Sequence, residues 1–493
     1  MSTCSVARSL RVMALAAAVA LLVACFGGCQ GGGGGAPESG QSAAVSGQST
    51  AAEQPAVDVS DRASADASAD APAAAGTELL GTSSQGTGEA SGQAGASADI
   101  EARVAQKLTS MTLEEKVAQM FVARAESLCS DGSTLLYVDD DVRANLQKCP
   151  VGGVALLAPN FTEPAQASAL AEGLQDASND ASGLDLLLCV DEEGGSVSRI
   201  GSNPAFGDQD AGDMRVIGDS GDTQAAYDAA LHMGSYLAKY GYNADFAPVC
   251  DIDNPSGGTM YERSFGSTAE AVDPMVRAQV RGFNDAGVMS CAKHFPGIGA
   301  AAGDSHEQSI TTSKTLDEML SQDLVPFEAA IEAGVPMVMV GHISCPGVTG
   351  NSTPATFSHE LVTDVLRGQL GFDGVVVTDA MGMGAATAAF TDAEAGVRAV
   401  EAGVDLVLMP MDLDASYQGL LSAVQQGTIP ESRIDESVTR ILRMKLSYAG
   451  VASSVNAGAA SSVNAGQQSD GQLDQQSQGQ SGQQSPDLLD QTA

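Results

Sequence analysis

The sequence predicts one parallel (β/α)8 barrel, flanked by segments that do not fold. Three observations carry this prediction: eight short apolar runs occupy the middle of the chain, helix-like stretches separate several of them, and polar residues follow the ends of most runs. Continuous apolar runs are typical of strands buried on both faces, as in parallel sheets. The chain has 493 residues, which is enough for a barrel of about 250 residues with tails. An open doubly wound sheet is the alternative, because periodicity alone does not close a sheet.

Residues 1–25 are expected to be an export signal rather than part of the fold. Two arginines precede an apolar run over 12–24, which is too short to span a bilayer. The run ends in Leu-Val-Ala-Cys, which resembles a bacterial lipobox, so Cys25 is the predicted lipidation site and Cys29 a weaker candidate. A plain secretory signal cleaved nearby is the alternative. Either interpretation places the mature protein outside the cytoplasm, and the first anchors it to the cell membrane.

Two low-complexity segments flank the middle of the chain. Residues 26–100 and 450–493 are rich in Gly, Ala, Ser and Gln, a composition that buries too little apolar surface to offset the entropy cost of ordering. We therefore expect a disordered tether over 26–100, one domain over 101–449 and a disordered tail over 450–493.

The net charge limits the partners. The chain carries 23 Lys+Arg against 62 Asp+Glu, a formal net charge of −39. This balance repels nucleic-acid phosphates and anionic lipid headgroups. We therefore expect no nucleic-acid partner and no membrane contact other than the lipid anchor.

The eight apolar runs predict eight strands. They span 118–122, 153–157, 184–190, 244–249, 288–292, 337–340, 374–377 and 404–408. Helix-type spacing of apolar residues is clear over 225–240 and 361–370.

Polar side chains follow the ends of five runs. Asp191 follows the third run, Asp251 and Asp253 the fourth, Lys293 and His294 the fifth, His342 the sixth and Asp379 the seventh. The carboxyl ends of barrel strands form the active-site face. A single Asp after a strand is often only a helix N-cap, but five such positions in register favour a shared site.

Carboxylates with nearby cations suit polyhydroxylated substrates, whose hydrolysis uses a carboxylate nucleophile and a separate proton donor. The sequence has no Cys-x-x-Cys, no His-x-Glu and no Gly-rich phosphate loop. It therefore implies neither a metal nor an organic cofactor.

Five segments resemble sequence motifs of glycoside hydrolase family 3, and they occur in the same order along the chain as in that family. They are the sugar-binding loop at 190–195 with Arg199, the arginine loop at 262–266, the Lys-His-Phe-Pro-Gly-Ile-Gly motif at 293–299 followed by Asp304-Ser305-His306, the segment at 354–358, and the nucleophile strand at 374–381. Within the family the pattern is similar to the β-N-acetylglucosaminidase (NagZ-type) branch. The resemblance covers nearly all of the domain over 101–449.

The resemblance implies a retaining exo-glycosidase that removes terminal β-linked N-acetylglucosamine from peptidoglycan or chitin-type fragments. By this resemblance Asp379 is the nucleophile and His306 the acid/base, with Asp304 supporting the His306 ring. Histidine suits both proton steps because its unperturbed pKa is about 6.5. The residues implied to bind the sugar are Asp191, Arg199, Arg263, Lys293 and His294. One departure is Ile298, which stands where many relatives have a second histidine.

Three other functions stay open. A β-glucosidase or β-xylosidase of the same family typically takes its acid/base from a second domain, which we do not expect here because 450–493 has the composition of a disordered tail. A phosphorylase is the second of these. A histidine acid/base tolerates a phosphate nucleophile better than a carboxylate does, because a carboxylate repels the phosphate charge. A non-catalytic sugar-binding lipoprotein is disfavoured because Asp379 and His306 are both intact.

The cysteines of the expected domain carry no predicted catalytic or metal-binding chemistry. Cys129 and Cys149 flank the loop after the first run and could pair in an oxidising compartment, although connectivity is not readable from sequence. Four others lie in or near strand runs, where we expect buried, inert thiols: Cys189, Cys250, Cys291 and Cys345.

Overall fold

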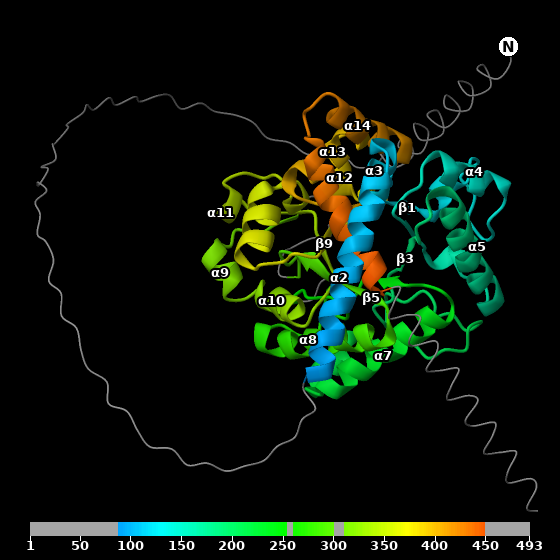
Figure 1. Ribbon diagram of the computed structural model, residues 1–493. Coiled ribbons are helices and arrows are strands. Elements are labelled where there is room, and N and C mark those ends of the chain that lie inside the picture. The colour runs from blue at the N-terminus through cyan, green and yellow to red at the C-terminus, as the bar shows by residue number, and fades with distance from the viewer. Residues whose placement is uncertain (1–86, 254–259, 300–309, 449–493) are drawn as a thin grey trace, which may run out of the picture. The chain divides into compact units, whose positions relative to one another are not determined.

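Eight short parallel strands form the centre of the fold (Figure 1). The computed structural model describes residues 87–253, 260–299 and 310–448. The eight strands are β1 (Phe121–Arg124), β2 (Gly153–Ala155), β3 (Leu187–Val190), β4 (Ala244–Asp245), β5 (Met289–Phe295), β7 (Met337–Val340), β9 (Val375–Thr378) and β10 (Val407–Leu408). From β1 to β9 each strand pairs in parallel with the next of the eight, and β1 also pairs with β10. A bridge between Val377 and Leu406 joins β9 to β10. The sheet therefore closes, which confirms the predicted barrel over the open sheet.

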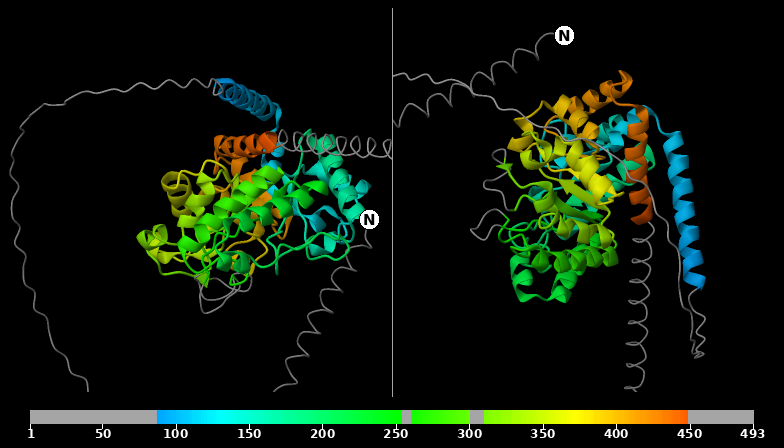
Figure 2. Two further views of the ribbon diagram at one scale, coloured as in Figure 1. Left: turned by 90° about the horizontal axis from the view of Figure 1, so that it is seen from below. Right: turned by 90° about the vertical axis from the view of Figure 1, so that its left-hand side faces the viewer.

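Helices surround the strands, as Figures 1 and 2 show. They are α2 (Thr87–Ser110), α3 (Leu113–Gln119), α4 (Asp140–Lys148), α5 (Pro164–Ser182), α6 (Met214–Ser220), α7 (Thr223–Lys239), α8 (Ala269–Ala286), α9 (Leu316–Leu320), α10 (Val325–Glu332), α11 (Pro346–Thr349), η5 (Glu360–Gln369), α12 (Gly384–Thr387), α13 (Asp392–Ala402), α14 (Leu413–Gln425) and a final helix over 431–448. Short turns η2 (Ala125–Leu128), η3 (Ala158–Asn160) and η4 (Ala355–Phe357) and a small sheet of β6 (Ile310–Thr311) and β8 (Ile343–Ser344) complete the set. Both segments predicted as helices, 225–240 and 361–370, are helical as α7 and η5.

The first apolar run, over 118–122, is only partly a strand. Residues 118–119 end helix α3, and β1 begins only at Phe121. A capping box between Thr112 and Glu115 starts α3, and its last turn buries Val117 and Ala118. A short apolar run reads the same in a buried helix turn and a buried strand, so periodicity did not separate them.

Part of the segment expected to be a tether is helical. Helix α2 begins at Thr87 and packs its C-terminal half on the barrel domain through Ile100, Val104 and Leu108, which recur every four residues. Figure 2 shows α2 beside the final helix, where Arg443 pairs with Glu101. Residues 1–86 and 449–493, which include the rest of the expected tether, the lipobox-like segment and the expected tail, lie outside the described residues.

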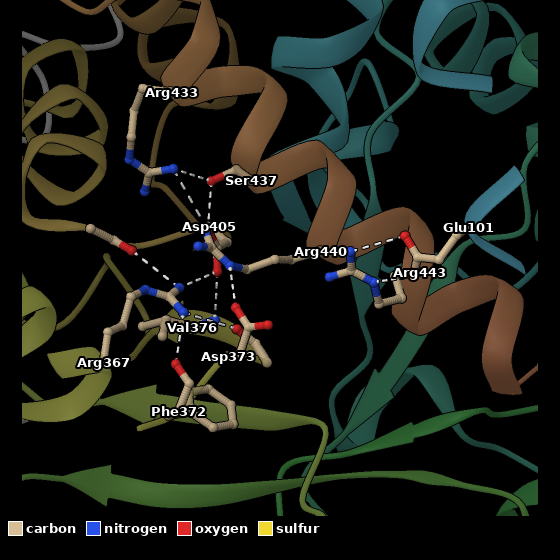
Figure 3. A network of polar contacts seen from close by, with 12 residues as sticks. Glu101, Arg367, Phe372, Asp373, Val376, Asp405, Arg433, Ser437, Arg440 and Arg443 are labelled. Carbon is tan, nitrogen blue, oxygen red and sulfur yellow. Dashed lines mark hydrogen bonds and ion pairs between the residues drawn. The ribbon is translucent and has the colours of Figure 1, made fainter. Parts of the chain in front are cut away.

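Side chains reinforce the seam between β9 and β10, as Figure 3 shows around Asp405. The Asp405 Oδ2 atom accepts the Val376 N–H at 3.0 Å, and the Thr378 Oγ1 atom accepts the Leu408 N–H at 2.9 Å. Three arginines surround the same carboxylate: Arg367 at 2.5 Å, Arg440 at 3.3 Å and Arg433 at 3.7 Å. These contacts fix β9, whose last residue precedes Asp379.

The core is apolar and its thiols are inert. Cys189, Cys250, Cys291 and Cys345 are buried as free thiols, and burial raises the pKa of each. Cys129 and Cys149 are free as well.

Among the described residues, no helix has the length and hydropathy needed to cross a bilayer.

Candidate active site

A cavity of about 540 Å³ opens at the carboxyl ends of the barrel strands. Six residues that the sequence predicted for the site line it together: Asp191, Arg199, Arg263, Lys293, His294 and Asp379. They come from the ends of β3, β5 and β9 and from the loops that follow β3 and β4. The predicted residues Asp304 and His306 lie outside the described residues, as does Cys25.

Lys293 sits between two carboxylates. Its side chain is 2% exposed, and its Nζ atom lies 2.7 Å from Asp191 Oδ1 and 2.5 Å from Glu193 Oε1. Burial alone would lower the pKa of Lys293, but these two carboxylates raise it above its usual value. Lys293 therefore stays charged inside the cavity.

Glu193 pairs with both Lys293 and Arg263. Its two oxygens accept hydrogen bonds from the Nε and Nη2 groups of Arg263, each at 2.7 Å. Burial would raise the pKa of Glu193, but Lys293 and Arg263 outweigh it and lower the pKa to about 2. Fork-like pairing of this kind fixes direction as well as charge, so Arg263 is held rigidly at the wall of the cavity.

The buried Asp251 carboxylate orients the His294 ring. The His294 Nδ1–H donates to Asp251 Oδ2 at 2.7 Å, and the Ile298 N–H donates to Asp251 Oδ1 at 2.6 Å. Asp251 is fully buried, so one carboxylate holds both the ring and the loop that follows β5. Ile298 contributes its backbone to this contact and lines the cavity with its side chain.

Asp379 directly follows β9 and is 8% exposed. Its Oδ1 atom accepts the N–H of Ala380 at 2.7 Å. Burial by itself would raise the pKa of Asp379, but the electrostatic effect of His294 and His342, with the adjacent N–H, lowers it below its usual value. The carboxylate is thus kept ionised in the cavity, which a carboxylate nucleophile requires.

Besides Asp251, two predicted polar residues do not line the cavity. His342 contacts Thr356 Oγ1 at 2.8 Å and the Ala380 carbonyl oxygen at 3.1 Å, behind the Asp379 segment. Asp253 pairs with Arg215 at 2.8 Å. Both are buried, and neither is among the residues that line the cavity.

Sequence reasoning missed the methionines that line the cavity. Five methionines line it: Met260, Met339, Met383, Met409 and Met411. Nothing in their spacing distinguishes them from core residues, because they come from four separate parts of the chain. Sequence reasoning also missed the pairing of Glu193 with Arg263, although Glu193 lies within the quoted loop motif.

Comparison with known proteins places this site in a family. The family described as "Glycosyl hydrolase family 3 N terminal domain" matches residues 112–444, which include all eight barrel strands and every cavity-lining residue named above. The chain belongs to glycosyl hydrolase family 3. The resemblance seen in the sequence motifs is therefore confirmed at the level of the family.

Curated relatives of the chain carry hexosaminidase names. The chain is similar to beta-hexosaminidase LpqI of Mycobacterium tuberculosis, with 37% identity over 276 residues, covering 53% of this chain and 68% of LpqI. It is also similar to beta-hexosaminidase A of Pseudoalteromonas piscicida, with 32% identity over 325 residues, covering 61% of this chain and 54% of that protein. The chain thus spans just over half the length of the second relative.

Two solved structures share the fold. A β-N-acetylglucosaminidase from Paenibacillus sp. str. FPU-7 superposes with a TM-score of 0.64 at 39% identity, covering 69% of this chain and 63% of that one. A β-glucoside phosphorylase, BglX, superposes with a TM-score of 0.62 at 25% identity, covering 71% of this chain and 61% of its own.

Proposed function

We propose that the chain is a retaining exo-β-N-acetylhexosaminidase that removes terminal β-linked N-acetylglucosamine. The observation that carries this proposal is the Asp379 carboxylate, which is held ionised at the end of β9 in a cavity lined by paired carboxylates and cations. The relatives named beta-hexosaminidase support the choice of sugar. Peptidoglycan or chitin-type fragments are the proposed substrates.

The proposed reaction has two steps. Asp379 attacks the anomeric carbon, the bond from that carbon to the leaving oxygen breaks, and His306 gives the leaving oxygen a proton. His306 then takes a proton from water, whose oxygen attacks the anomeric carbon and releases Asp379. Asp304 supports the His306 ring, and no metal or organic cofactor enters either step.

Glu193 is not suited to be the proton donor, which supports a separate one. Glu193 has a pKa of about 2, and both of its oxygens are occupied by Arg263. Its carboxyl group therefore carries no proton to give near neutral pH. Asp191 and Lys293, which pair at 2.7 Å, are placed to meet sugar hydroxyls with an acceptor and a donor.

A screen of p-nitrophenyl glycosides tests the activity. The purified protein should release nitrophenol fastest from the β-N-acetylglucosaminide and far more slowly from the β-glucoside and β-xyloside. The Asp379→Asn variant is the matched control and should release almost none. Faster turnover of the β-glucoside would reject the hexosaminidase in favour of the glucosidase alternative.

A phosphorylase is the second candidate, because BglX shares the fold and a histidine acid/base suits a phosphate nucleophile. Product analysis with and without inorganic phosphate separates the two. Hydrolysis yields the free sugar at the same rate in both buffers. Accumulation of the sugar 1-phosphate, with turnover that depends on phosphate, would identify a phosphorylase.

We also propose that the protein is exported and anchored through lipid on Cys25, in a setting of cell-wall turnover. The support is the order of basic, apolar and lipobox residues in the sequence. The Cys25→Ala variant should lose labelled palmitate, whereas the matched Cys29→Ala variant should keep it. The reverse pattern would assign the lipid to Cys29, and no label in the wild-type protein would reject the anchor.

A further inference from the structure

Glu192 lies between two cavity residues, Asp191 and Glu193, yet its side chain faces away from the cavity. It is fully buried and is not among the residues that line the cavity. Its Oε2 atom accepts the N–H of Arg199 at 2.8 Å and that of Ile200 at 2.9 Å, and its Oε1 atom accepts the N–H of Gly201 at 3.0 Å. The backbone over 199–201 is therefore wound around one carboxylate.

Two hydroxyl groups complete the shell of Glu192. The Ser198 hydroxyl and the Tyr236 hydroxyl both donate to Oε1, the latter at 2.8 Å from helix α7. Burial and the Glu192 carboxylate raise the pKa of Tyr236, so its hydroxyl keeps the proton that it donates. A carboxylate has about four lone-pair sites, so these five donors saturate it. An amide in its place would turn N–H groups toward other N–H groups.

The turn also depends on a close approach at Gly201. A Cβ atom there would lie 2.9 Å from the Tyr236 hydroxyl and 3.1 Å from Glu192 Oε1. A side chain at position 201 would therefore displace the backbone of 199–201 from the Glu192 carboxylate.

The side chain of Arg199 has little else to hold it. Its guanidinium lines the cavity 3.8 Å from Asp191 Oδ2, and its buried Nε atom has no hydrogen-bond partner within the described ranges. By contrast, Arg263 is locked by two bonds of 2.7 Å to Glu193. The backbone that Glu192 holds thus sets the point from which the Arg199 side chain reaches the cavity.

We propose that Glu192 is a positioning residue for Arg199. It acts through the backbone of 199–201, with Tyr236 as its anchor in α7, and makes no contact with substrate. This inference rests on the proposed hexosaminidase activity for its kinetic readout, but its structural readout is independent of activity.

A double-mutant cycle tests the coupling. Glu192→Gln should lower kcat/KM by roughly tenfold, mainly through KM, and should lower it less than about twofold further in an Arg199→Ala background. Equal losses in the two backgrounds would overturn the proposal, because Glu192 would then act without Arg199.

Tyr236→Phe provides a milder variant if Glu192→Gln does not fold. Tyr242→Phe is its matched control, because Tyr242 is as deeply buried and its hydroxyl donates to the Ala167 carbonyl at 3.0 Å, away from the loop. Hydrogen exchange at the amides of 199–201 should quicken severalfold in Tyr236→Phe and stay unchanged in Tyr242→Phe.

The exchange measurement separates the two proposals. If the wild-type protein cleaves no hexosaminide, the proposed function fails, and faster exchange at 199–201 in Tyr236→Phe would still support the role of Glu192. If the wild-type protein is active but exchange at 199–201 is the same in both tyrosine variants, the positioning role is rejected.

Discussion

Both oxygens of the Glu193 carboxylate accept a hydrogen bond from the Arg263 guanidinium, each at 2.7 Å. Lys293 lies 2.5 Å from the same carboxylate, so three charges share one buried corner of the cavity. Breaking such a group costs more than removing a surface pair, because the remaining charges stay buried without a partner.

Glu193→Gln should therefore destabilise the fold. We expect the free energy of unfolding to fall by about 3–5 kcal/mol at neutral pH, measured by chemical denaturation. Glu401→Gln is the control, because Glu401 pairs with Arg398 at 3.0 Å near the surface, and its loss should cost less than about 1 kcal/mol. Similar small losses in both variants would contradict the account of this corner.

The same pair predicts a dependence on pH. The pKa of Glu193 is lowered from 4.5 to about 2, so its contribution to stability is present above pH 4.5 and is lost as pH falls toward 2. The difference in unfolding free energy between wild type and Glu193→Gln should shrink over that range. A difference that stays constant down to pH 2 would show that the charge of Glu193 is not what stabilises the site.

Lys445 predicts a dependence of the same sense at higher pH, at a position far from the cavity residues in sequence. Burial lowers the pKa of Lys445 from 10.5 to about 7, although it donates to Gln119 Oε1 at 2.9 Å. The unfolded chain binds more protons here between pH 7 and 10.5, so this group makes stability rise with pH by up to about 1.4 kcal/mol per unit. Lys445→Met should flatten the rise, and Lys148→Met, at a side chain that is 73% exposed, should not.

The proposed acid/base pair predicts a dependence on the leaving group. His306→Ala should reduce kcat/KM far more for a natural disaccharide than for the p-nitrophenyl glycoside, which departs with little protonation. Azide should partly restore His306→Ala by replacing water in the second step. Asp304→Asn should lose less than His306→Ala. Equal losses on both substrates, with no azide rescue, would place the proton donor elsewhere.

The barrel was predictable because each strand is buried on both faces and so appears as an unbroken apolar run. The residues at strand ends followed from the rule that carboxyl ends form the active-site face, which brought Asp191, Lys293 and Asp379 into one cavity. The helical turn at 118–119 was not predictable, because a buried helix turn and a buried strand share the same apolar composition.

The side-chain pairings inside the site also could not be predicted from the sequence. Glu193 and Arg263 lie 70 residues apart, and neighbouring Glu192 and Glu193 face opposite directions. Which of two adjacent glutamates meets the cations depends on how the loop after β3 turns, and apolar periodicity carries no information on that turn.

The central claim is that Asp379 forms the covalent intermediate, and mechanism-based labelling tests it most directly. A 2-fluoro or 5-fluoro glycoside inactivator should slow the second step enough for the sugar to stay attached. Mass spectrometry of the digested protein should then find the added sugar on the peptide that contains Asp379, and Asp379→Asn should take up none. A label on Asp191 or Asp251 instead would contradict the assignment of the nucleophile.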